Sequence, residues 1–175
     1  MSIDAIRFKS YNNVIDTLKC VGEQHLNIHT VSSGDLWELD LEKNTLFPLF
    51  HINPVNVTVG MNTRTFNFQL FVMDLVEPDE SNEQEVLSDC LEIMNDIIAI
   101  YKHGEILYGY DAAAGEEQRY FIDNDFTIDP FTERFDNAVS GWVMSFSITV
   151  KRVKQLQHTN RQHNNMFKIK ITITI

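Results

Sequence analysis

The stretch from residue 81 to residue 104 constrains the fold most, because it carries a wide apolar stripe at helical spacing. The apolar side chains that recur every three or four residues are Val86, Leu87, Cys90, Leu91, Met94, Ile97, Ile98 and Tyr101. Ser81 followed by Gln84 predicts a capping box, and Gly104 predicts the helix end. A stripe this wide needs a large apolar surface to lie on, so we expect the helix to pack across a sheet.

Strand patterns on both sides of this helix supply that surface. Residues 55–59 and 66–72 alternate apolar with polar side chains around a turn at 60–62, which predicts a β-hairpin. Residues 142–150 form the clearest alternating strand, and Gly141 before them permits a bulge or a close backbone approach. We expect Trp142, Phe146 and Ile148 of this strand to pack against Leu91, Met94 and Ile98 of the helix.

The remaining elements are shorter. A second helical stripe runs from Ile6 to Val21 and ends at Gly22, residues 25–31 suit a short strand, and residues 32–34 suit a turn. Pro48 indicates an edge strand or loop at 46–52, and residues 130–138 suit a connector. Residues 37–42 alternate like a half-buried strand.

These patterns predict an α+β fold, a mainly antiparallel sheet with two helices packed on one face. The 175 residues, 43% of them hydrophobic, suffice for one domain with an arm. We expect an α+β domain over residues 1–150, followed by a basic linker and C-terminal β arm over 151–175. No membrane span or signal peptide is expected, and Cys20 and Cys90 suit buried free thiols in a reducing cytoplasm.

The candidate chemical motifs all favour structural interpretations. His25 and His29 lack further ligands at metal spacing, and the acidic run from Asp123 to Asp129 lacks the glycine and glutamate of a calcium loop. Ser140 lacks the strand–turn–helix setting of a nucleophile, and His103 suits a helix C-terminus. We therefore expect no catalytic residue, no metal site and no cofactor.

The net charge of −11 is unevenly distributed. Nine acids and no Lys or Arg lie between Asp74 and Asp96, whereas six Lys or Arg and no acids follow from Lys151 onward. An acidic body repels phosphates, which argues against wrapping by nucleic acid. The basic end could bind phosphate, but we favour contact with an acidic neighbouring subunit.

The C-terminal arm is the strongest candidate for an interface. Its alternating apolar residues are Phe167, Ile169, Ile171, Ile173 and Ile175, and the basic residues before them include Lys151, Arg152 and Lys154. An unpaired strand of this kind promotes aggregation, so it must pair. It pairs either within its own sheet or with a neighbouring subunit by β-augmentation.

Three segments of the chain resemble structural proteins of tailed bacteriophages. They are residues 48–55 leading into 66–74, residues 85–96, and residues 131–142. The resemblance is greatest to tail and neck ring proteins of crAss-like phages, and the order of elements is similar to the tail-terminator fold. It covers roughly residues 36–150.

The resemblance implies a non-enzymatic virion protein, a tail terminator or connector that joins portal and neck to tail. It implies a homo-oligomeric ring, six- or twelve-fold, in contact with other neck, portal and tail proteins. Genomic DNA would pass through without specific binding, no membrane would be involved, and assembly would occur in the host cytoplasm. The alternative is a small cytoplasmic enzyme or ligand-binding domain with its site near residues 111–117.

Overall fold

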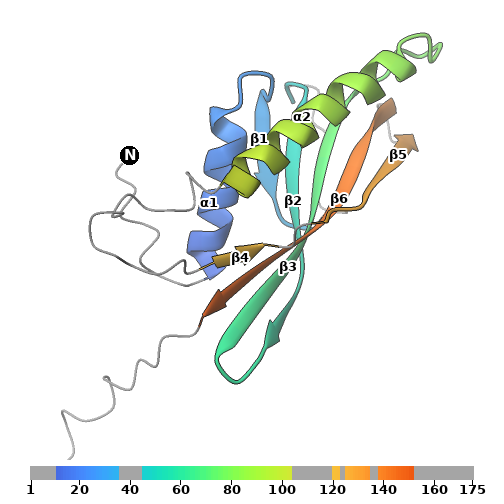
Figure 1. Ribbon diagram of the computed structural model, residues 1–175. Helices are drawn as coiled ribbons and strands as arrows, with labels where there is room; N and C mark the ends of the chain where they lie inside the picture. Colours follow the sequence, from blue (N-terminus) through green and yellow to red (C-terminus); the bar gives the residue numbers. More distant parts are fainter. Residues whose placement is uncertain (1–10, 36–44, 104–119, 123–124, 135–137, 152–175) are drawn as a thin grey trace, which may run out of the picture.

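The computed structural model describes residues 11–35, 45–103, 120–122, 125–134 and 138–151. The elements are α1 (Tyr11–Gln24), β1 (Thr30–Ser33), β2 (Leu49–Val59), β3 (Thr63–Leu75), α2 (Glu83–His103), β4 (Tyr120–Ile122), β5 (Ile128–Arg134) and β6 (Ala138–Lys151). They form an α+β fold, a mostly antiparallel sheet with two helices, which confirms the predicted class (Figure 1).

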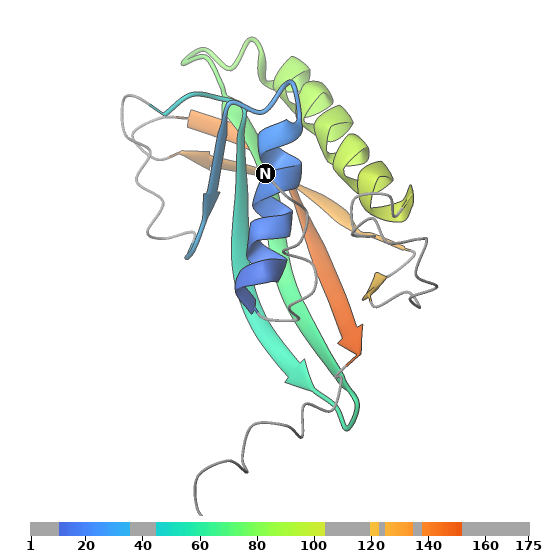
Figure 2. The same ribbon diagram turned by 90° about the vertical axis from the view of Figure 1, so that its left-hand side faces the viewer.

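The sheet has the order β1-β2-β3-β6-β4, and β5 also pairs with β6. β4 pairs with the last residues of β6 and β5 with the first, so the two short strands share one edge. β1 runs parallel to β2, and the other pairings between described strands are antiparallel. The predicted hairpin is β2–β3, and it extends beyond the ends of both helices (Figures 1 and 2).

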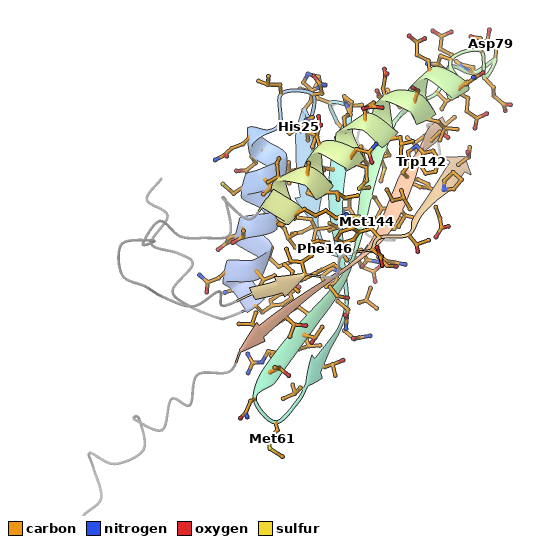
Figure 3. The ribbon with its side chains drawn as sticks, viewed as in Figure 1. His25, Met61, Asp79, Trp142, Met144 and Phe146 are labelled. Atoms are coloured by element: carbon orange, nitrogen blue, oxygen red, sulfur yellow. The ribbon has the colours of Figure 1, made fainter. Side chains whose placement is uncertain are left out.

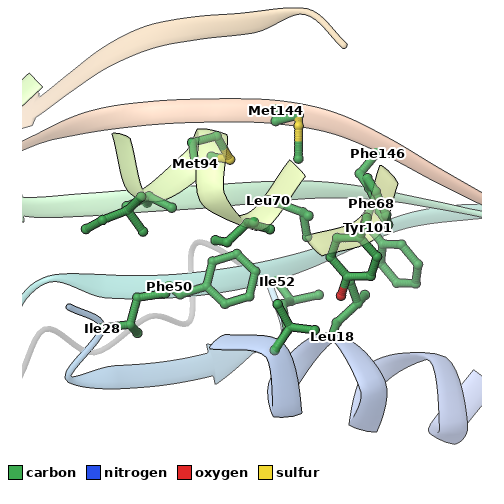
Figure 4. Close-up of a cluster of buried hydrophobic side chains, with 14 of the residues drawn as sticks. Leu18, Ile28, Phe50, Ile52, Phe68, Leu70, Met94, Tyr101, Met144 and Phe146 are labelled. Atoms are coloured by element: carbon green, nitrogen blue, oxygen red, sulfur yellow. The ribbon is translucent and has the colours of Figure 1, made fainter. Parts of the chain in front are cut away.

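Both helices cover the same face of the sheet and enclose the main core. Leu18 of α1, Met94 and Tyr101 of α2, and the inward side chains of β2, β3 and β6 meet there (Figure 4). The opposite face carries a second, smaller apolar cluster around Leu49, Phe71 and Met73. The sheet is therefore apolar on both faces at one end.

The predicted capping box at the start of α2 is wrong. The Ser81 hydroxyl donates to Asp79 Oδ1 at 2.8 Å instead of capping the helix. The backbone carbonyl of Asn82 accepts the first helical bond, from the Val86 N–H at 3.0 Å, and the helix begins at Glu83. Asn82 is the N-cap residue by position, and its side chain accepts from the Glu77 N–H at 2.8 Å.

The predicted stripe of α2 is confirmed, with a shifted centre. Its buried members are Val86, Cys90, Met94, Ile97 and Tyr101, and Ile93, which the predicted stripe did not include, is buried with them. Leu91 and Ile98 lie at the margin and are half-buried, so the core position expected for Leu91 is wrong. Trp142 is also half-buried, and its indole N–H donates to the Leu87 carbonyl at 2.6 Å, which ties α2 to β6.

Two predictions based on proline, for residues 46–52 and for residues 130–138, are wrong. The segment after Pro48 is an inner part of β2, paired with both β1 and β3, and β2 then continues through Pro54 with a register shift. The pairing of β1 ends at Ile52, so the missing N–H of Pro54 leaves no bond to β1 unmade. The predicted connector around Pro130 is instead β5, an edge strand that tolerates proline for the same reason.

Two predictions near the N-terminus were also wrong. β1 begins at Thr30 and includes Ser32 and Ser33, which were expected in a turn. α1 continues past Gly22 to Gln24, because this glycine is a packing position: a Cβ there would collide with the ring of Phe50. Ile6 and the predicted strand at 37–42 lie outside the described residues.

Truncating Met94 to Ala should lower the free energy of unfolding by about 2–5 kcal/mol, because the side chain is completely buried and its loss leaves a cavity. The matched control is Leu91→Ala, which removes a half-buried side chain from the same helix and should cost less than half as much. Denaturant unfolding measures both. Equal losses would show that the outer margin of α2 is as tightly packed as its centre.

Candidate functional site

The two histidines considered as metal ligands do not meet. His25 Nδ1 accepts from the Asn27 N–H at 3.2 Å, so its Nε2 carries the proton and donates to Asp96 Oδ2 at 3.3 Å. His29 Nδ1 bonds the Phe47 carbonyl at 2.6 Å. Both residues precede β1, contrary to the expected strand, and each is used to hold a turn in place.

The other metal candidates are also dispersed. Asp125, Thr127 and Asp129 are exposed, and Asp129 lies in β5; Asp123 lies outside the described residues. Within the described ranges, no group of three or more His, Cys, Asp or Glu is placed to hold a metal ion. The two cysteines are unpaired, and burial, with Asp74 and Asp89 nearby, raises the pKa of Cys90 to about 12. Its thiol is therefore unreactive near neutral pH.

Ser140 belongs to a structural junction. It is fully buried, and its hydroxyl lies 2.9 Å from Thr132 Oγ1 and 3.4 Å from Glu83 Oε1. Thr132 also donates to Glu83 Oε1 at 2.9 Å. These bonds fasten the N-terminus of α2 to β5 and β6. A serine that is 0% exposed and bonded to neighbouring side chains lacks the access that a nucleophile requires. The side chain of His103 lies outside the described residues.

His51 is the buried polar residue that the sequence analysis missed. It is 1% exposed on the face of the sheet opposite the helices, and its Nδ1 shares a hydrogen bond with Ser32 Oγ at 2.7 Å. Its Nε2 has no hydrogen-bond partner. Desolvation lowers the pKa of His51, while the Gly34 backbone and Asp35 act in the opposite direction. Burial of the imidazole therefore favours its neutral form. The sequence signal for this buried histidine was its position inside the apolar run 46–52.

The same face is polar toward the hairpin end. Asn53 donates to Gln69 at 3.1 Å, and Asn67 donates to Asn56 at 2.6 Å. Ser147 donates to Asn67 at 2.7 Å, and Thr65 bonds Thr149 at 2.8 Å. We call this network the polar ladder. It crosses three strands with uncharged side chains that satisfy one another.

The largest apolar exposure on the described strands lies on the β2–β3 hairpin. Val55, Val57, Val59 and Met61 are exposed by 53%, 44%, 61% and 93%, and we call these four residues the hairpin surface. A hollow of about 80 Å³ lies beside them, lined by Tyr11 and Phe66 among others, and it is too small for an ordinary substrate. Figure 3 shows Met61 at the free end of the hairpin, far from the helices.

The acids form a separate surface at the other end of the molecule. Those exposed on α2 and the turn before it are Glu77, Asp79, Glu80, Glu85, Asp89, Glu92 and Asp96. Asp79 and Met61 lie at opposite ends of the molecule in Figure 3. We call these seven residues the acidic surface. The hairpin surface and the acidic surface thus lie at opposite ends of the molecule.

The residues predicted as an interface can be placed only in part. Lys151 is the last residue of β6 and pairs with Thr63, next to the hairpin turn. Arg152, Lys154 and the alternating residues from Phe167 to Ile175 lie outside the described residues. Lys151 therefore lies at the end of the sheet that carries the hairpin surface.

No protein-family model matches the chain, and no curated protein matches its sequence. In the described part of the chain, no helix is long and apolar enough to cross a membrane.

Stability should fall on acidification from about pH 7 to about pH 5, and His51 should contribute to the fall. Its folded-state pKa is below the ordinary 6.5, so the unfolded chain takes up this proton first as the pH decreases, which favours unfolding. The free energy of unfolding of a His51→Phe variant should depend less on pH over this interval. His29→Gln, at an exposed histidine, is the matched control. If the free energy of unfolding of the parent and His51→Phe chains depended on pH in the same way, the contribution of His51 would be contradicted.

Proposed function

We propose that this chain is a non-enzymatic structural subunit of a tailed-bacteriophage particle. It assembles into a homo-oligomeric ring, as a tail terminator or connector that joins portal and neck to tail, and the ring surrounds the DNA conduit. The basis for the phage assignment is the resemblance of residues 36–150. The loop at 111–117, on which the enzyme alternative depends, lies outside the described residues.

The hairpin surface is the observation that carries the proposal. It places three valines and a methionine in solvent on a hairpin that projects beyond the rest of the domain. Fully burying an exposed valine is worth about 1.5 kcal/mol or more. These valines are about half exposed, so each gives only part of that gain when it is covered, and the gain favours association. Apolar exposure concentrated at one projecting element is typical of a protein-protein contact.

The charge distribution supports the same proposal. The net charge of −11 repels phosphate, which suits a subunit past which DNA must slide without adhering. The basic residues that follow Val150 provide a complementary partner for the acidic surface of another subunit. When the basic segment of one subunit contacts the acidic surface of the next, the contact is head-to-tail. Repeated contacts of this kind close into a ring if the rotation between neighbouring subunits allows it.

Light scattering coupled to gel filtration should show one discrete species whose mass is a multiple of the 20.3-kDa subunit, with six or twelve copies expected. Electron microscopy of the same fraction should show rings with a central opening. A monomer at all accessible concentrations would overturn the proposal, and an open-ended distribution of masses would exclude a closed ring.

Assembly should weaken as salt rises from about 0.05 M to about 0.5 M, because exposed ion pairs between subunits are screened over this range. The variant Glu85→Gln/Asp89→Asn/Glu92→Gln removes three exposed charges from α2 and should assemble less well at low salt, with a smaller salt dependence. If assembly of the parent chain does not depend on salt, apolar contacts and not ion pairs drive it.

A further inference from the structure

We infer that the C-terminal strand, residues 167–175, of one copy adds to the outer edge of β2 in a neighbouring copy, at Val55–Val59. This inference rests on the self-association that the proposed function requires, and it assigns the two surfaces that meet. The acceptor is a described strand edge. The donor is identified by its sequence pattern.

Among the described residues, β1 covers only the first part of the outer edge of β2. The β1–β2 ladder ends at the pair Ser33–Ile52, and Gly34 N–H donates to the Ile52 carbonyl at 3.1 Å as the chain turns away. Beyond this point β2 pairs with β3 alone, among the described residues. An edge of this kind offers unpaired backbone N–H and C=O groups to another strand.

The side chains on this edge fit the donor. After the register shift, Val57 pairs with Phe66 and Val59 with Arg64, so both valines lie on the face of the sheet that carries the helices. Thr58 pairs with Thr65 and lies on the opposite face with the polar ladder. The arm has the same two-sided pattern, apolar at odd positions from 167 to 175 and Lys or Thr at even positions. A strand added here buries its apolar side chains against Val57 and Val59.

The length of the intervening segment favours a neighbouring copy. Lys151 ends β6 three strand positions from the outer side of β2, a distance of about 15 Å that about five residues can span. Residues 152–166 reach about 50 Å when extended. A segment this long exceeds what a return to the same sheet needs, and it is sufficient to reach an adjacent subunit.

Disulfide cross-linking between two co-expressed chains tests the inference. One chain carries Thr58→Cys and a mass tag, the other carries Thr172→Cys, and both carry Cys20→Ala to remove the accessible native thiol. Because residues on one face of neighbouring strands approach closely, Thr58→Cys should link to Thr172→Cys, giving a species with one chain of each kind. Ile173→Cys, on the other face of the arm, should link several-fold less, and Gln84→Cys in place of Thr58→Cys, on exposed α2, should not link.

The outcomes separate this inference from the proposed function. Face-dependent linking between chains supports it, whether the particle is a closed ring or an open chain. Rings that form without the link, or a link found only within one chain carrying both Thr58→Cys and Thr172→Cys, overturn the inference and leave the ring intact. A parent chain that stays monomeric overturns both.

Discussion

The long antiparallel pairing of β3 with β6 is the constraint on which the other elements depend. It runs without interruption from Thr63–Lys151 to Leu75–Val139, and every other strand except β1 pairs directly with one of these two. Close approach of the two strands requires glycine at position 141, since a Cβ there would collide with the backbone of Val72 and Met73. The next residue, Trp142, donates to the Leu87 carbonyl. Adjacent residues of one strand therefore fix both the sheet and the helix on it.

Local periodicity was sufficient to predict α2, the β2–β3 hairpin and β6, because each contains a stretch of five or more residues that keeps one periodicity. It failed where pairing partners decide the structure. Residues 49–52 pair on both sides although Pro48 precedes them, and Pro130 lies in a strand because no described neighbour needs its missing N–H. The information on these pairing partners lies elsewhere in the chain. Gly22 was misread for the same reason: only the position of Phe50 shows that it permits packing and does not stop the helix.

The candidate site was predictable to a smaller extent. The alternation of Val55, Val57 and Val59 was visible in the sequence, but a strand pattern does not reveal which face is left uncovered. Their exposure follows from the projection of the hairpin beyond α1 and α2, a tertiary property. His51 was missed because its neighbours are apolar and because its hydrogen-bond partner, Ser32, was expected in a turn and not in a strand parallel to β2.

The polar ladder makes part of the sheet hydrophilic with side chains that already bond to one another. Asn67 illustrates this, since its amide donates to Asn56 and its carbonyl accepts from Ser147. Side chains committed in this way have already lost their rotational freedom, and an incoming molecule would have to break existing bonds before making its own. A ligand that bonds to Asn67 or Ser147 on this face therefore gains less free energy than it would from side chains that are free to move.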